Sequence, residues 1–563
     1  MREASNLVLT NAVVRTLDES SPRADTVVIR DGRVAWVGWQ REAPATADLR
    51  VVDLGGSTIL PGLIDAHSHP ALVAMSRWHI RLPETDDLEE LLDFIRSYGH
   101  VHSKEEAPYL YFEYYSPSIF PADGPTRQML DAAISDRPVL CQDAGDHASW
   151  VNTRMLELLG VTKDTADPVP GLEMFIRDEG GEPTGHVLEN AHAHFLPTMY
   201  RALEWSPPEE PTAEVIAPVL EYLSSRGIVA IFDALIERPE VIEAINDLDR
   251  LGALPMHYEG AVRFRTRADL AEALDLVRRL DGERASERVR VRTVKLFLDG
   301  TNELGTSAVI EPLQSGGNAG SLGSIQMEQA ELEDCLELCN AAGVDIHIHM
   351  VGDRAFRTAC DAVENVLGSE RRRETPWRMQ VTFAHCELID SADMTRPADL
   401  GIIINWTNHW SGGYFGDEAI QHLGEERWNR MYDFNDVADA GAVLAFSSDV
   451  VSNAELHRAD PFFGMQIAAT RVDPEVPLDG GRWPQSRRPS SSAALSTERL
   501  VRGYTVHAAR QLRIQDTFGM IAPGRPAHLI ILNRDPLVTP PTELSEIVPS
   551  AVIFDGRVVS GSL

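Results

Sequence analysis

Histidine and aspartate side chains occur where several apolar runs of this sequence end. Those side chains are His67, His69, His347, His349, His385 and Asp449, and one further apolar run contains Lys295. Imidazole and carboxylate groups are ligands for zinc, and also for manganese, iron or cobalt. Residues two apart in a strand point the same way, so His67 and His69 can reach one ion. The pattern therefore predicts a metal site, in which His347 is expected to pack beside the ligands.

Lys295 is unusual because it lies inside an apolar run. An ammonium group in a buried strand is costly unless it is paired. Two interpretations follow, and the sequence leaves both open. Lys295 could contact a carboxylate, or carbon dioxide could carbamylate it and give an anion able to bridge two metal ions.

Eight apolar runs must position these side chains. They span residues 59–66, 228–234, 256–262, 289–298, 344–350, 379–386, 401–406 and 442–448. Continuous apolar runs are typical of parallel strands buried on both faces, and helix-like amphipathic segments separate several of them. We therefore predict an α/β fold with a (β/α)8 barrel over residues 59–509. The carboxyl ends of its strands would form the active-site face.

The chain ends and one long interval do not follow this alternation of apolar runs and helix-like segments. Residues 1–58 and 510–563 both read as short strands, with similar Asp-Gly-Arg turns at 31–33 and 555–557. Neither end alone has enough strands for a core, so we expect them to form one β domain together. Residues 70–226 are too long for a barrel connection and are predicted to be an insertion that forms a lid over the site.

Composition narrows the class of protein. The 563 residues carry 51 Lys and Arg against 86 Asp and Glu, a formal charge of −35. Such an acidic surface disfavours nucleic acid and anionic membranes as partners. We find no run of the roughly 18 apolar residues that a spanning helix needs, and no signal-peptide pattern. Five unclustered cysteines suit a reducing compartment, so a cytoplasmic protein is expected.

Several motifs together resemble one protein family. They are the segments 60–69 (LPGLIDAHSH), 294–300 (VKLFLDG), 349–355 (HMVGDRA), 383–386 (FAHC) and 447–449 (SSD), with 146–152 (DHASWVN) in the insertion. In this order they resemble the amidohydrolase-3 branch of the amidohydrolase superfamily, which holds YtcJ-like and N-substituted formamide deformylase-like hydrolases. The resemblance covers nearly the whole chain, and it implies that the terminal strands form a composite β-sandwich.

The resemblance also implies roles for the metal-site residues. His67, His69 and Asp449 would hold the more buried ion, His349 and His385 a second, and carbamylated Lys295 would bridge them. The metal would be zinc, as one or two ions. Asp449 would be the catalytic acid and base. The implied reaction is hydrolysis of a C–N bond, in an amide, N-acyl or N-formyl compound, by a metal-activated hydroxide.

Substrate contacts are expected around the mouth of the barrel. The expected contacts are His147, Trp150, Tyr114, Trp406 and His409. With Tyr111, Tyr115, Trp410 and Tyr414, they indicate a pocket for a small aromatic or bulky apolar substrate. His192 and His194 repeat the spacing of His67 and His69 but lie in the insertion, and we interpret them as structural. A homodimer is possible on this reading.

Three alternative functions remain open. The same barrel supports deaminases and hydrolases of cyclic imides or lactones, because the fold does not decide the reaction. A catalytically silent scaffold is the third alternative, and the complete set of six metal-site residues argues against it.

Overall fold

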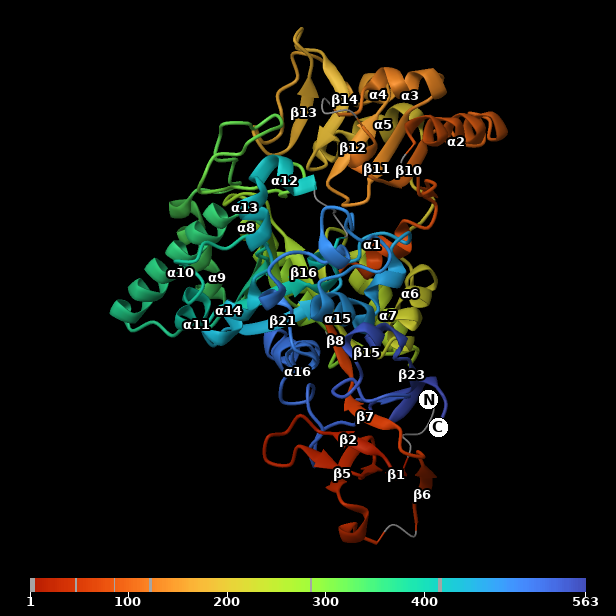
Figure 1. The fold of residues 1–563 in the computed structure, drawn as a ribbon, viewed down its shortest axis with the longest axis vertical. Coiled ribbons are helices and arrows are strands. Elements are labelled where there is room, and N and C mark those ends of the chain that lie inside the picture. Colours follow the sequence, from red (N-terminus) through yellow and green to blue (C-terminus); the bar gives the residue numbers. More distant parts are fainter. Residues whose placement is uncertain (1–5, 46–47, 86, 121–123, 284–285, 414–417) are drawn as a thin grey trace.

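A computed structural model describes the chain except for residues 1–5, 46–47, 86, 121–123, 284–285 and 414–417 (Figure 1). Tyr414, one of the aromatic residues expected near the site, lies outside the described residues. The chain has three regions along its long axis, with the barrel between the terminal strands and the insertion (Figure 1). Within the described ranges, no helix is both long enough and apolar enough to cross a bilayer.

The predicted barrel is confirmed. Eight parallel strands form one sheet in the order β8-β15-β16-β17-β18-β19-β20-β21. The backbone N–H of Asp449 donates to the carbonyl of His67 over 2.8 Å, joining the two edges of this sheet. The strands are β8 (Leu63–Ser68), β15 (Ile228–Ile236), β16 (His257–Arg263), β17 (Val289–Phe297), β18 (Asp345–Met350), β19 (Val381–His385), β20 (Ile403–Thr407) and β21 (Val443–Ser447).

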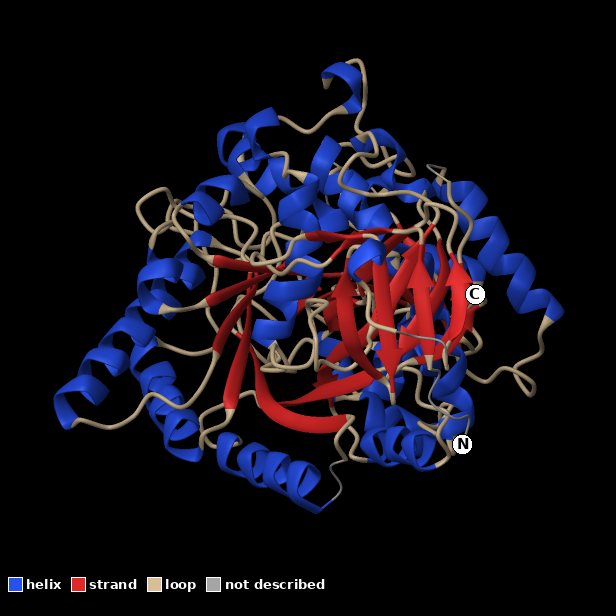
Figure 2. Ribbon diagram, turned by 90° about the horizontal axis from the view of Figure 1, so that it is seen from below, coloured by secondary structure: helices blue, strands red, loops and turns tan. Residues whose placement is uncertain are grey.

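Helices surround these strands (Figure 2). The helix α7 shows why, because Val241, Ile245 and Leu248 recur three or four residues apart and are all buried. The helices of this layer include α6 (Ala213–Ser225), α7 (Glu240–Arg250), α8 (Leu270–Glu283), α9 (Gln329–Ala342), α10 (Asp353–Arg373), α11 (Arg396–Leu400), α14 (Phe434–Asp439), α15 (Pro461–Thr470), α16 (Thr497–Arg502) and α17 (Ala508–Gln511). Cys335 and Cys339 are buried on α9, as expected for residues that pack a helix.

The first apolar run is two strands rather than one. Residues Thr58–Pro61 form β7 in a terminal sheet, and β8 starts at Leu63. Gly62 lies at the junction, where its N–H donates to the carbonyl of His528. A Cβ atom at Gly62 would come within 2.4 Å of the Val229 side chain, so the close approach of the strands requires glycine.

The strands of the two chain ends lie in two sheets, of which the first is N-terminal only and the second joins both ends. The first sheet contains β1 (Leu7–Thr10), β4 (Thr26–Arg30), β5 (Arg33–Gly38) and β6 (Arg50–Asp53). The second contains β2 (Val13–Arg15), β3 (Arg23–Ala24), β7, β22 (Leu529–Leu532), β23 (Pro549–Phe554) and β24 (Arg557–Gly561). Leu9 and Val27 pack in one apolar cluster with Ile531 and Ile553. The two chain ends therefore share one apolar core.

The insertion carries a mixed sheet of its own at the opposite end of the barrel (Figure 1). Its strands are β9 (Ile80–Arg81), β10 (Leu110–Tyr115), β11 (Val139–Asp143), β12 (Ala148–Val151), β13 (Met174–Arg177) and β14 (Pro183–Leu188), with helices α2 (Leu88–Val101), α3 (Arg127–Ala133), α4 (Thr153–Leu159) and α5 (Leu196–Leu203). The two ends of the predicted interval, α1 (Pro70–Met75) and α6, pack in the main core with the barrel strands.

Candidate metal centre

Three side chains from the two edge strands of the barrel converge on one point. His67 and His69 lie at the end of β8, and Asp449 follows β21. Asp449 Oδ1 lies 3.0 Å from His69 Nε2 and 3.3 Å from His67 Nε2. One ligand atom from each residue fits within 4.8 Å of the others. Asp449 has a φ of 51°, a strained value for aspartate that its backbone bond to His67 holds in place.

Two further histidines complete the cluster. His349 is the last residue but one of β18 and His385 is the last residue of β19, and their ring centres lie 4.5 Å apart. His385 Nδ1 is 3.5 Å from Asp449 Oδ2, and its ring centre is 5.0 Å from that of His67. Asp449 therefore has Oδ1 beside His67 and His69 and Oδ2 beside His385.

Lys295 lies in the middle of this cluster. It is 0% exposed, and its Nζ is 3.2 Å from His67 Nε2. No carboxylate oxygen of the described residues lies within 4.0 Å of Nζ. Burial lowers the pKa of Lys295 to about 7, although the charge of Asp449 opposes the shift. No carboxylate of the described residues is therefore close enough to form a simple ion pair with Lys295.

The histidine cluster fits a divalent cation. His69 Nδ1, His349 Nε2 and His385 Nδ1 are buried and have no hydrogen-bond partner. A buried polar atom without a partner costs free energy, and a metal ion bound to the imidazole lone pairs removes this cost. Burial holds the pKa values of His67, His349 and His385 well below the ordinary value, so these rings are neutral and able to donate lone pairs.

Neighbouring groups hold the cluster in place, and sequence reasoning missed the role of one of them, Asp65. His347 Nε2 lies 3.1 Å from His67 Nδ1, which fits its predicted role as a packed histidine. Asp65 accepts hydrogen bonds from the hydroxyl and the N–H of Ser448, over 2.6 and 3.0 Å, and so fixes the loop that carries Asp449. Asp65 was within reach of sequence reasoning because it lies in the same motif as His67.

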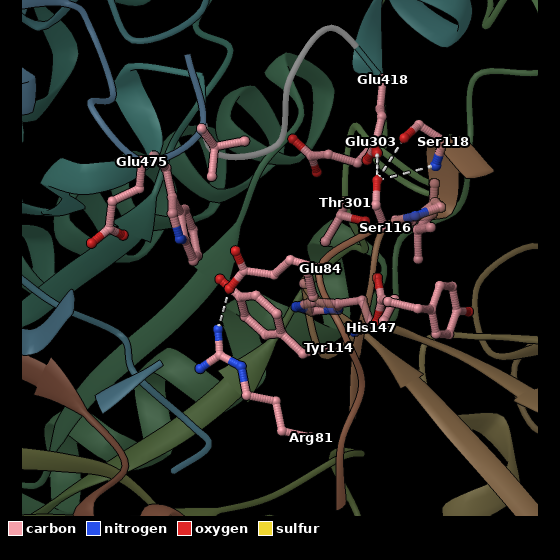
Figure 3. Close-up of a pocket in the computed structure, with 18 of the residues that line it drawn as sticks. Arg81, Glu84, Tyr114, Ser116, Ser118, His147, Thr301, Glu303, Glu418 and Glu475 are labelled. Carbon is pink, nitrogen blue, oxygen red and sulfur yellow. Dashed lines mark hydrogen bonds and ion pairs between the residues drawn. The ribbon is translucent and has the colours of Figure 1, made fainter. Parts of the chain in front are cut away.

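Two cavities meet beside these histidines. The metal cavity, of about 660 Å³, is lined by the six predicted metal-site residues. The adjoining cavity, of about 730 Å³, is lined by loops of the barrel and of the insertion (Figure 3). The two cavities share Ala144, Gly145, His147, His349 and Trp410.

His147 stands at this junction, as expected for a substrate contact. Its Nδ1 lies 2.6 Å from Glu189 Oε2, and its ring centre is 5.9 Å from that of His349. Burial favours the neutral ring, but the Glu189 carboxylate outweighs burial and raises the pKa of His147 to about 9. Glu189 is held in turn by the Thr306 hydroxyl and by the Thr301 N–H. Glu189 gave no signal in the sequence, because no motif includes it.

Of the other four expected substrate contacts, only Tyr114 lines one of the two cavities. Tyr114 lines the adjoining cavity, with Arg81 stacked 4.7 Å from its ring centre. Trp150 does not line either cavity: it is buried in the insertion core, and its indole N–H donates to the carbonyl of Thr126. The expectation for Trp406 is also corrected, because its side chain lines neither cavity. It stacks on Phe434 instead, at 4.2 Å between ring centres. Side chains alternate along a strand, and Asn405 takes the inward position on β20.

The last expected contact and the two insertion histidines lie outside the cluster. His409 is buried against Trp410 and lines neither cavity, so the structure does not place it as a substrate contact. His194 forms an ion pair with Glu173. His192 is buried and lines the metal cavity, but its position is away from the ligand cluster on β8, β18 and β19.

Known proteins resemble this chain along most of its length. The model of the Amidohydrolase family matches residues 50–560. The exoenzymes regulatory protein AepA of Pectobacterium carotovorum is 26% identical, over 78% of this chain and 93% of its own. The N-substituted formamide deformylase of Arthrobacter pascens is 26% identical, over 99% of this chain and 98% of its own. A crystal structure of an uncharacterized metal-dependent hydrolase from Pyrococcus horikoshii superposes with a TM-score of 0.68, at 23% identity, covering 95% of this chain and 99% of that one.

Proposed function

This chain belongs to the amidohydrolase family, and we propose that it is a metal-dependent hydrolase that cleaves a C–N bond in an amide, N-acyl or N-formyl compound. The observation that carries this proposal is the cluster of buried histidines around Asp449, with three ring nitrogens that lack hydrogen-bond partners. The N-substituted formamide deformylase, similar over nearly the full length, supports the choice of bond.

The cluster offers ligands for two ions. His67, His69 and Asp449 would hold the first, and His349 and His385 the second. We propose zinc as the metal and a carbamate on Lys295 as the group between the two sites. Bound zinc lowers the pKa of water toward neutrality and polarises a carbonyl oxygen.

Asp449 is the proposed catalytic acid and base. Its carboxylate lies beside His67, His69 and His385, and its backbone is hydrogen-bonded to β8. In this role Asp449 accepts a proton from the attacking water and later delivers it to the leaving nitrogen. Water adds to the carbonyl carbon, the C–N bond breaks, and the products are a carboxylic acid and an amine.

His147 is proposed to orient the substrate. Glu189 occupies its Nδ1, so Nε2 is the atom left to face the space where the two cavities meet. A hydrogen bond from Nε2 to the substrate carbonyl would hold the scissile bond beside Asp449.

A substrate screen tests the proposed reaction. Zinc-loaded protein supplied with bicarbonate is expected to release acid and amine in equal amounts from at least one of a set of N-formyl, N-acetyl and N-arylacyl amines. The acid is measured by chromatography and the amine by a fluorogenic reagent. Release of ammonia from cyclic amidines, with no amide cleaved, would instead favour the deaminase alternative.

A further inference from the structure

Glu189 connects the insertion to the barrel beside the metal cluster. It follows β14, and only 8% of its side chain is exposed. Its Oε2 lies 2.6 Å from Nδ1 of His147, which is in the loop between β11 and β12. Its Oε1 accepts hydrogen bonds from the hydroxyl of Thr306 and, over 3.2 Å, from the N–H of Thr301. Both threonines are in the loop that follows β17, so the two oxygens of one carboxylate bind the insertion and the barrel.

The barrel loop is shaped to receive this carboxylate. A Cβ atom at Gly300 would come within 2.5 Å of Glu189 Oε1 and within 2.3 Å of Thr306 Oγ1, so the close approach requires glycine. The hydroxyl of Thr306 is held as well, because it accepts a hydrogen bond from the N–H of Thr301 over 2.9 Å. The Glu189 side chain is therefore fixed by the barrel loop at one oxygen and by His147 at the other.

The backbone of Glu189 is held in an unfavourable conformation. Its φ is 48°, in the left-handed region that glutamate rarely adopts. On one side of it, Leu188 pairs with Ala148 in the insertion sheet, and on the other the N–H of Asn190 donates to the carbonyl of His147 over 3.3 Å. Backbone strain of this kind persists only where the surrounding structure fixes it, and it clusters at functional sites.

The ring of His147 has one nitrogen left for a ligand. Nδ1 faces Glu189, and Nε2 has no hydrogen-bond partner among the described residues. The ring lines both cavities, and its centre lies 5.9 Å from the ring centre of His349. Without the contact at Nδ1 the ring could rotate about its side-chain bonds, and Nε2 would lose its fixed direction toward the junction of the cavities.

We propose that Glu189 is a positioning residue of the hydrolytic site, which fixes the ring of His147 so that Nε2 faces the carbonyl oxygen of the bound amide. The barrel loop takes part, because Thr301 and Thr306 fix the carboxylate. This inference rests on the proposed function, in which His147 orients the substrate, and it assigns that orientation to a contact between the insertion and the barrel. The effect of Glu189 on the reaction must then pass through His147.

A cycle of substitutions tests whether Glu189 acts through His147. In zinc-loaded protein, His147→Ala and Glu189→Ala are each expected to lower kcat/KM for the best amide about 10²-fold, the loss typical of a misplaced orienting group. The double variant is expected to be no slower than either single one, because the second substitution removes nothing that still acts. Rates are expressed per equivalent of bound zinc. Losses that multiply to about 10⁴-fold would overturn the inference, since Glu189 would then act independently of His147.

A milder substitution keeps both the carboxylate and the ring. Thr306→Val removes one donor to Glu189 with little change of shape, so we expect kcat/KM to fall about three- to tenfold, and not at all in His147→Ala protein. Glu157→Ala is the control, because Glu157 is exposed on α4 in the insertion and lines neither cavity. A Thr306→Val effect of equal size in both backgrounds, or no effect in either, would contradict the role of the barrel loop.

Binding separates this inference from the proposed reaction. Acetohydroxamate, which carries a carbonyl oxygen beside a metal-binding hydroxyl, is titrated into the zinc-loaded variants by calorimetry. We expect its affinity to fall about tenfold in His147→Ala, Glu189→Ala and the double variant alike. If no amide is hydrolysed by the unmodified protein but this pattern is found, the positioning role stands and the hydrolase proposal fails. If amides are hydrolysed but the two losses multiply in rate and in affinity, the positioning role fails and the hydrolase proposal stands.

Discussion

Asp449→Asn is expected to keep bound metal and to lose about 10²–10⁴-fold in kcat, the range typical of a general acid–base residue. Asparagine retains an oxygen that can act as a ligand, and it keeps the shape of the loop that Asp65 and Ser448 hold. It cannot take a proton from water. Steady-state kinetics on the best amide, with metal content measured on the same preparation, makes the test.

The control for this substitution is Asp436→Asn. Asp436 is exposed on α14 and lines neither cavity, so its loss should change neither metal content nor kcat. Turnover of Asp449→Asn protein within a few fold of the unmodified protein would refute the role of Asp449 as acid and base. If the variant lost both its metal and its turnover, Asp449 would be assigned the role of a metal ligand alone.

Lys295→Arg is expected to abolish turnover, with a loss of at least about 100-fold, because arginine keeps the positive charge but cannot form the carbamate. The ion-pair interpretation predicts the opposite, since a cation would be preserved. Lys295→Ala is expected to lose turnover to the same extent. Short carboxylic acids such as acetate are expected to restore part of its activity by entering the space left by the side chain. Kinetics with and without acetate gives the comparison.

Direct detection of the carbamate supports the kinetic test. Protein loaded with zinc in ¹³C-bicarbonate should show a carbamate carbon resonance that is missing from Lys295→Ala protein. A fully active Lys295→Arg variant, or a spectrum unchanged by Lys295→Ala, would contradict the carbamate. Either result would leave the five other proposed ligands in place.

The barrel and the cluster were predictable because their signals are local. Each barrel strand falls on one apolar run, although the first run also contains β7, and His67, His349 and His385 lie at or next to the carboxyl ends of their strands. Parallel strands of a closed sheet bring such ends together whatever the loops do. Asp449 could be placed with them because the first and last strands of a barrel are neighbours, as the bond from Asp449 to His67 shows.

The side chains that line the cavities were less predictable because their positions depend on packing between distant segments. Trp150 and Trp406 occur in motifs near the mouth, but strand alternation and the insertion core turn their rings away from the cavities. Glu189 reaches His147 only because β14 pairs with β12 in the insertion sheet.

Metal analysis of the purified protein tests the central claim most directly. After incubation with excess zinc and removal of unbound metal, we predict at least one equivalent per chain by plasma mass spectrometry. Chelation should remove both the metal and the amide hydrolysis, and added zinc should restore them together. Hydrolysis that persists with less than one equivalent of any divalent metal would contradict the account.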